Sequence, residues 1–84
     1  MQDNQSIETS IKNASWFKKL EVLRNLRGWS QTETADKCGT TQKNYWLWET
    51  GQAYPRKRSQ KAIASVFGVS VNELFPEVDV KKAV

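Results

Sequence analysis

The chain has 84 residues and a formal net charge of +4, and 38% of its residues are hydrophobic, 11% aromatic and 26% charged. This length and balance predict one small globular domain with a compact core that is rich in aromatic residues. With no histidine and a single cysteine, Cys38, the sequence excludes Ser–His–Asp and Cys–His nucleophiles, a zinc site of thiolate and imidazole ligands, and an internal disulfide.

The N-terminal part of the chain is polar up to the first predicted helix. We expect residues 1–14 to form a flexible N-terminal arm. A helix is predicted from Trp16 to Arg27, with Ser15 as its N-cap and Gly28 just past its end. Apolar residues recur along it at steps of four, three and three, which predicts that one face is buried. These residues are Trp16, Leu20, Leu23 and Leu26.

Two short helices follow with little chain between them. Ser30-Gln31-Thr32-Glu33 has the spacing of a capping box, so a second helix begins there and ends at Gly39. Thr41 is the predicted N-cap of a third helix, which ends at Gly51. The residues expected to face the core from these helices are Ala35, Cys38, Tyr45 and Trp48. Two short helices separated by about three residues that include glycine are the local pattern of a helix-turn-helix.

The remaining elements are also helical. A fourth helix is predicted from Arg56 or Lys57 to Phe67, and a second capping box, Ser70-Val71-Asn72-Glu73, begins a fifth helix that Pro76 closes. The absence of any strand pattern predicts an all-α fold, a compact five-helix domain that contains the helix-turn-helix. The predicted organisation is an arm (1–14), a helix-turn-helix domain (15–76) and a C-terminal tail (77–84).

Many of these positions form one ordered pattern with fixed spacings. They are Leu23-Arg24, Arg27-Gly28-Trp29-Ser30-Gln31, Glu33, Ala35, Lys37, Gly39, Thr41-Gln42, Trp48-Glu49, Gly51, Pro55, Ile63-Ala64, Phe67-Gly68-Val69-Ser70 and Glu73-Leu74-Phe75. The pattern resembles the Cro/phage-repressor helix-turn-helix family over about residues 16–75. The resemblance implies a lambda-repressor-like DNA-binding domain that works as a dimer on a near-palindromic operator. The sequence departs from the family at Thr34, Cys38, Trp46, Leu47, Lys57 and Gln60.

The third helix would be the recognition helix, because in this docking mode its first residues meet base edges in the major groove. The residues expected to read base edges are Gln42, Lys43, Asn44 and Leu47. Gln42 can pair with N6 and N7 of an adenine, and Leu47 can press on a thymine methyl group. The alternative for the polar members is an ordinary solvated helix face.

The positive charge is concentrated in one segment. Thr41 to Lys61 contains five cations and one anion, so its charge equals that of the whole chain. Three of the cations stand at the start of the fourth helix, where the helix dipole disfavours them, and DNA phosphates would compensate. The residues expected to contact phosphate are Gln31, Thr41, Thr50, Arg56, Lys57, Arg58 and Lys61. The alternatives are a solvated basic cluster and, for Gln31, a residue of a capping turn.

Two further expectations concern structural contacts. Arg24 and Glu49 occupy positions that in several family members form an ion pair between the first and third helices. The resemblance therefore implies that this pair fixes the recognition helix. Dimer contacts are expected from Phe75, Val78 and Val80, the apolar residues near the C-terminus.

These observations predict a sequence-specific regulator of transcription, a repressor of the bacterial or phage type, with no catalytic site, metal or cofactor. The alternative is a protein-interaction module, such as an antitoxin or an adaptor, that uses Trp46 and Leu47 with or without DNA binding. Glu33 and Asp36 are a carboxylate pair, but nothing in the sequence indicates a pocket around them, which disfavours an enzyme. No apolar run approaches ~20 residues, so no membrane span is expected, and the single cysteine suits the reducing cytoplasm.

Overall fold

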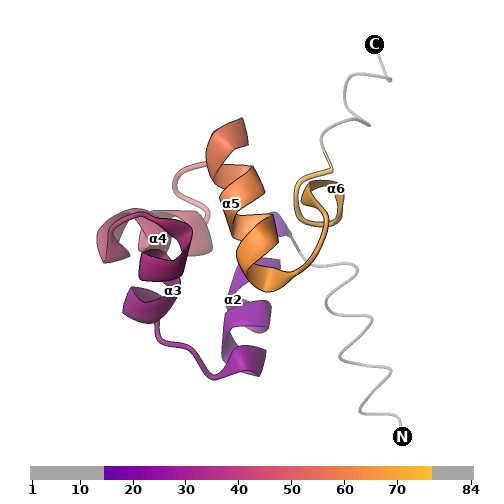
Figure 1. Cartoon of the computed structure of the whole chain (residues 1–84). Coiled ribbons are helices and arrows are strands. Elements are labelled where there is room, and N and C mark those ends of the chain that lie inside the picture. The colour runs from indigo at the N-terminus through magenta and orange to yellow at the C-terminus, as the bar shows by residue number, and fades with distance from the viewer. Residues whose placement is uncertain (1–14, 77–84) are drawn as a thin grey trace, which may run out of the picture.

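The computed structural model describes residues 15–76, which form five helices and no strand (Figure 1). The helices are α2 (Trp16–Arg27), α3 (Gln31–Cys38), α4 (Gln42–Glu49), α5 (Lys57–Phe67) and α6 (Val71–Leu74). The predicted all-α fold is therefore confirmed, and each helix lies where the sequence predicts it. The predictions for the arm (1–14), the tail (77–84), Val78 and Val80 lie outside the described residues.

Hydrogen bonds between residues close together in the chain determine where the helices begin and end. Four of the five begin with a serine or threonine whose hydroxyl accepts a hydrogen bond from a backbone N–H three residues later. These N-caps are Ser15, Ser30, Thr41 and Ser70. The full capping box forms at Ser70 and Glu73, whereas at Ser30 the structure shows the serine half of the motif. The remaining helix, α5, begins at Lys57, and its N-cap residue, Arg56, makes no side-chain cap hydrogen bond.

The turn between α3 and α4 depends on Gly39. Its φ of 75° lies in the left-handed region that only glycine adopts without strain. Its N–H donates to the carbonyl of Asp36, and the N–H of Thr40 donates to the carbonyl of Ala35. This closes α3 and sends the chain directly into α4, so the two helices pack against each other.

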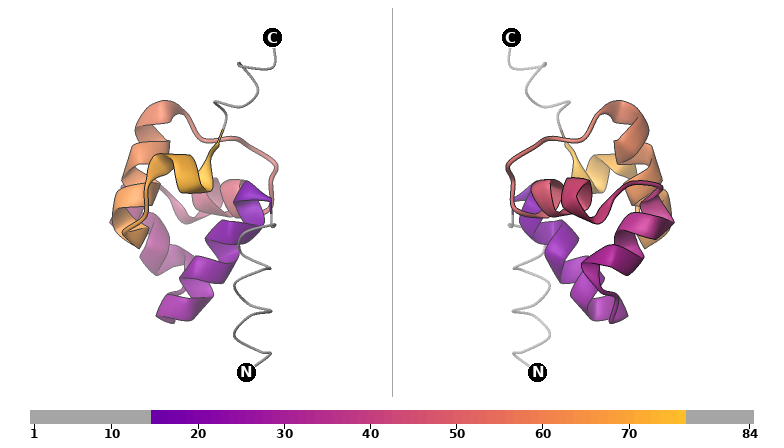
Figure 2. Two further views of the ribbon diagram at one scale, coloured as in Figure 1. Left: turned by 90° about the vertical axis from the view of Figure 1, so that its right-hand side faces the viewer. Right: turned by 90° about the vertical axis from the view of Figure 1, so that its left-hand side faces the viewer.

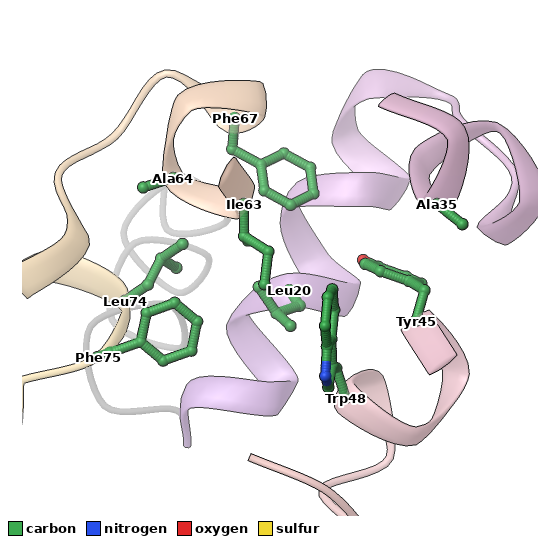
Figure 3. Packing of buried hydrophobic residues seen from close by; sticks show 9 residues of the cluster. All are labelled: Leu20, Ala35, Tyr45, Trp48, Ile63, Ala64, Phe67, Leu74 and Phe75. Carbon is green, nitrogen blue, oxygen red and sulfur yellow. The ribbon is translucent and has the colours of Figure 1, made fainter. Parts of the chain in front are cut away.

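One core joins all five helices. Leu20 from α2, Trp48 from α4 and Ile63 from α5 meet at its centre, and Leu74 and Phe75 cover one side (Figure 3). Leu20 and Ile63 are fully buried. Burying side chains of this size contributes about 1.5–3 kcal/mol each, which makes these contacts the main source of stability.

Leu26 is an exception to the predicted inner stripe of α2. Its residue is 61% exposed, so the prediction of burial is wrong. Two successive steps of three residues fall short of the 3.6-residue turn, and Leu26 is thereby rotated about 120° from Leu20. Leu26 also lies in the last turn of α2, at the edge of the core.

The expectation that Phe75 contributes to a dimer surface is also wrong. Its side chain is 3% exposed and belongs to the core of one protomer. The rings of Trp16 and Tyr54 lie 5.8 Å from it, centroid to centroid. The four-residue helix α6 turns the chain back toward α2 and carries Phe75 inward.

The helices divide into two sides of the molecule. α3 and α4 lie on one side, α6 on the opposite side, and α5 between them (Figure 1). The right-hand view of Figure 2 shows the molecule from the side of α3 and α4, and both helices lie in front there. The helix-turn-helix is thus presented on an outer surface, while α2 and α5 hold it from behind.

Candidate nucleic-acid interface

The candidate interface is built on the outer arc of α4. The inner arc carries Tyr45, Trp48 and Glu49, all buried. Those three side chains fix the rotation of the helix about its axis. The exposed residues are Gln42 in the first turn, Lys43, Trp46 and the C-cap Thr50, and Asn44 and Leu47 are half-buried. Of the four residues expected to read bases, Gln42 and Lys43 are therefore exposed, and Asn44 and Leu47 are half-buried.

A relay of hydrogen bonds links the exposed amide of Gln42 to the interior. Gln42 Nε2 donates to Gln31 Oε1 over 2.7 Å, and Gln31 Nε2 donates to Glu49 Oε1 over 2.8 Å. A carboxylate can only accept, so Glu49 turns the N–H side of the Gln31 amide toward itself. The oxygen of Gln31 then faces Gln42, which must present its own N–H. One buried charge thereby fixes the orientation of both amides.

Glu49 is the centre of this network. Arg24 contacts both carboxylate oxygens, with Nε–Oε2 at 2.7 Å and Nη2–Oε1 at 3.1 Å, and the Tyr45 hydroxyl donates to Oε2 over 2.9 Å. The ion pair between Arg24 and Glu49 is thus present, and it joins α2 to α4. Arg24 Nη1 also donates to the carbonyl of Trp29, which ties the turn before α3 to the same network.

The buried network changes the acidity of its members. The hydrogen bonds to Glu49 raise the pKa of Arg24, so the guanidinium stays charged. Burial, together with the negative charge of Glu49, raises the pKa of the Tyr45 hydroxyl well above its usual range. Tyr45 therefore remains a hydrogen-bond donor to the carboxylate at every physiological pH. Burial also raises the pKa of the Cys38 thiol to about 11, which leaves it protonated and a poor nucleophile.

Asn44, Thr41 and Thr50 have structural contacts of their own. Asn44 is half-buried and its Nδ2 donates to Thr40 Oγ1 over 2.8 Å. The hydroxyl of Thr41 caps α4, and that of Thr50 donates to the carbonyl of Trp46 over 2.8 Å. These contacts hold the two ends of α4 in place.

A basic surface adjoins α4 at the start of α5. Arg56, Lys57, Arg58 and Lys61 are all exposed, and no ion pair holds any of them in the described part of the chain. A hollow of about 340 Å³ lies between this surface and α4. Its lining residues are Asn44, Trp48, Ala53, Tyr54, Pro55, Arg56 and Ser59. Because α5 has no side-chain cap, the backbone N–H groups of its first turn add to the positive potential here.

The sequence indicates which residues form this surface, but it does not show the hydrogen bonds that connect them. Gln31 and Gln42 are 11 residues apart, and no sequence motif indicates that their side-chain amides form a hydrogen bond. Two further polar residues, Thr34 and Gln60, are buried at positions where the family is often aliphatic. The Thr34 hydroxyl donates to the carbonyl of Ser30, and Gln60 Nε2 donates to that of Pro55. Their burial is tolerated because these polar groups are hydrogen-bonded.

A family model described as helix-turn-helix matches residues 20–74, which is more than half of the chain. The chain belongs to the Cro/C1-type helix-turn-helix family. The matched range contains α3 and α4, the helix-turn-helix itself, and all of the residues that surround Glu49. This membership makes the helix-turn-helix a DNA-binding element and DNA its partner. Comparisons with curated proteins and with solved structures gave no match. None of the helices between residues 15 and 76 is long and apolar enough to cross a membrane.

Proposed function

We propose that the chain is a sequence-specific repressor of transcription that inserts α4 into the major groove of double-stranded DNA. The observation that carries this proposal is the fixed orientation of the Gln42 amide. A side chain that discriminates between bases needs a defined donor and a defined acceptor. The relay from Glu49 through Gln31 supplies both before DNA arrives.

The free groups of Gln42 match an adenine. One hydrogen of Nε2 is used by Gln31, which leaves the second hydrogen and the oxygen Oε1. In the major groove an adenine offers N7 as an acceptor and N6–H as a donor, in the arrangement that a glutamine amide can satisfy at two points. A guanine presents two acceptors at the same place, so Oε1 would have no donor. Gln42 therefore favours adenine.

The other residues of the proposed interface extend this contact. Lys43 donates to a guanine or a phosphate, Leu47 contacts a thymine methyl group, and Asn44 offers its free Oδ1. The proposed phosphate contacts are Gln31, Thr41, Thr50, Arg56, Lys57, Arg58 and Lys61. A homodimer would place two copies of α4 about one DNA turn, ~34 Å, apart on a near-palindromic operator.

Selection from a random duplex library tests the proposal. The full chain should enrich one sequence with an adenine in each half-site. Gln42→Ala should bind that sequence about 5- to 150-fold more weakly and lose its preference at that base pair, because a bidentate contact contributes ~1–3 kcal/mol of discrimination. Asn25→Ala, which removes an exposed amide side chain from α2, is the matched control and should keep both. Enrichment of no sequence, or a silent Gln42→Ala, would contradict the proposal.

The exposure of Trp46 favours one alternative, a protein-interaction module such as an antitoxin or an adaptor. Its residue is 38% exposed although tryptophan is a large apolar side chain. Under this alternative Trp46→Ala abolishes binding to a protein partner and leaves DNA binding intact. The experiment below separates the two possibilities.

A further inference from the structure

Trp46 is an exposed residue of α4 that has no role in the proposed contact between Gln42 and adenine. At about 100° per residue it lies within ~40° of Gln42 on the helical wheel, one turn further along α4. Both residues are exposed, whereas Glu49 and Tyr45, which border this arc on the side toward the core, are buried. Gln42 and Trp46 therefore form one continuous edge of the helix.

The other three tryptophans have structural roles that Trp46 lacks. Trp16 packs against Tyr54, Trp29 stacks on Phe67, and Trp48 contacts Tyr45 edge to face. Between residues 15 and 76, no such ring contact includes Trp46. The fold thus does not account for an indole at this position, and its burial against a ligand would be favourable.

The surroundings of Trp46 fit the major groove. Lys43 is exposed on the same outer arc, and the carboxylate of α4, Glu49, is 7% exposed and paired with Arg24. The outer arc thus combines positive charge with an apolar ring. The major groove combines flanking phosphates with one apolar group, the 5-methyl of thymine.

We infer that Trp46 contacts the 5-methyl group of a thymine in the base step next to the adenine bound by Gln42. This inference rests on the proposed function and specifies its recognition sequence. Trp46 is then a specificity-determining residue of the interface. Leu47, which lies about 100° further round the helix, would contact a different base pair.

Deoxyuridine substitution tests the inference, because uracil differs from thymine only by that methyl group. The duplex selected by the full chain is remade with deoxyuridine in place of each thymine in turn. At the thymine next to the adenine bound by Gln42, the wild-type affinity should fall about fourfold, the equivalent of ~0.8 kcal/mol for one buried methyl group. A thymine contacted by Leu47 would be a second, separate position, and its effect should persist in Trp46→Ala. Trp46→Ala should bind the thymine duplex more weakly and no longer distinguish it from the deoxyuridine duplex. This is a double-mutant cycle across the interface.

Two controls separate this effect from a general loss of apolar surface or of folding. Trp46→Phe retains an aromatic ring and should keep part of the discrimination. Leu26→Ala removes a large apolar side chain that is 61% exposed on α2, and it should change neither affinity nor discrimination.

Three outcomes would overturn the inference. If Trp46→Ala still discriminates fourfold, another residue contacts the methyl group. If it binds every duplex like the wild type, the indole does not touch DNA and serves a protein contact instead. In both cases Gln42→Ala still loses its base preference, so the proposed function stands. If the wild type selects no sequence at all, the proposed function fails and the inference fails with it.

Discussion

Glu49 shows how one buried charge controls a surface several residues away. Four side-chain hydrogen bonds reach its two oxygens, two from Arg24 and one each from Gln31 and Tyr45. Each acceptor position that water would occupy is thus filled by a donor of the protein. The outward effect is the fixed amide of Gln42. If Gln42 reads DNA as we propose, stability and recognition depend on the same carboxylate.

Replacing Glu49 by glutamine should therefore be strongly destabilising. The change keeps the shape but leaves the guanidinium of Arg24 without its counter-charge, and the side chain of Arg24 is only 14% exposed. We expect the free energy of unfolding to fall by about 2–4 kcal/mol, slightly less than for a fully buried pair because Arg24 retains some contact with water. Denaturant unfolding measures this loss.

The matched control is Glu33→Gln, which alters an exposed glutamate on α3. Its effect should stay within about 0.5 kcal/mol, as is usual for surface substitutions. Equal effects of the two substitutions would show that the network around Glu49 contributes no more than a surface charge.

At the scale of elements, α4 is held by its two ends and its inner face. Thr41 caps the beginning, Gly51 follows the end, and the buried rings of Tyr45 and Trp48 set its rotation. The sequence predicts the ends well because a cap is a contact between residues three or four positions apart. The sequence does not predict the exposure of Leu26, because burial in the last turn of α2 depends on whether another element covers that turn.

Gly51→Ala should destabilise the domain more than Gly28→Ala. Both glycines have positive φ, 78° and 74°, where an alanine costs roughly 1–2 kcal/mol. At Gly51 the added Cβ would also lie 2.8 Å from Cδ1 of the Phe17 ring, whereas at Gly28 nothing lies within 4 Å. Thermal unfolding of both variants compares them directly. If their transitions coincide, the ring of Phe17 moves aside freely and the close packing of α2 on this turn is unimportant.

At the scale of the molecule, positive charge adjoins the surface that we propose reads DNA. Arg56 lines the hollow beside α4, and Lys57, Arg58 and Lys61 follow it in the chain. In the proposed docking, a duplex placed against α4 would bring its phosphates to this segment. Positive charge far from α4 would strengthen DNA binding whichever face of the domain met the duplex. Charge next to α4 favours the one orientation in which α4 enters the groove.

The salt dependence of DNA binding tests this arrangement. Lys57→Ala should weaken binding to all sequences alike and reduce the slope of log K against log salt by ~0.9, the value for one phosphate contact. Lys18→Ala is the control, since Lys18 is an exposed lysine of α2 paired with Glu21. If both variants have the same slope, the cluster on α5 has no special relation to the phosphates.

The sequence by itself determined the five helices, their caps, the helix-turn-helix and the side of α4 that faces outward. All of these follow from spacings within a helical turn or from the ordered pattern of the family, and such signals are local. The tertiary structure decided what depends on residues far apart in the chain. It joined Gln42 to Glu49 through Gln31, buried Phe75 and exposed Leu26. A contact between segments depends on how whole helices pack, and no short stretch of sequence contains that information.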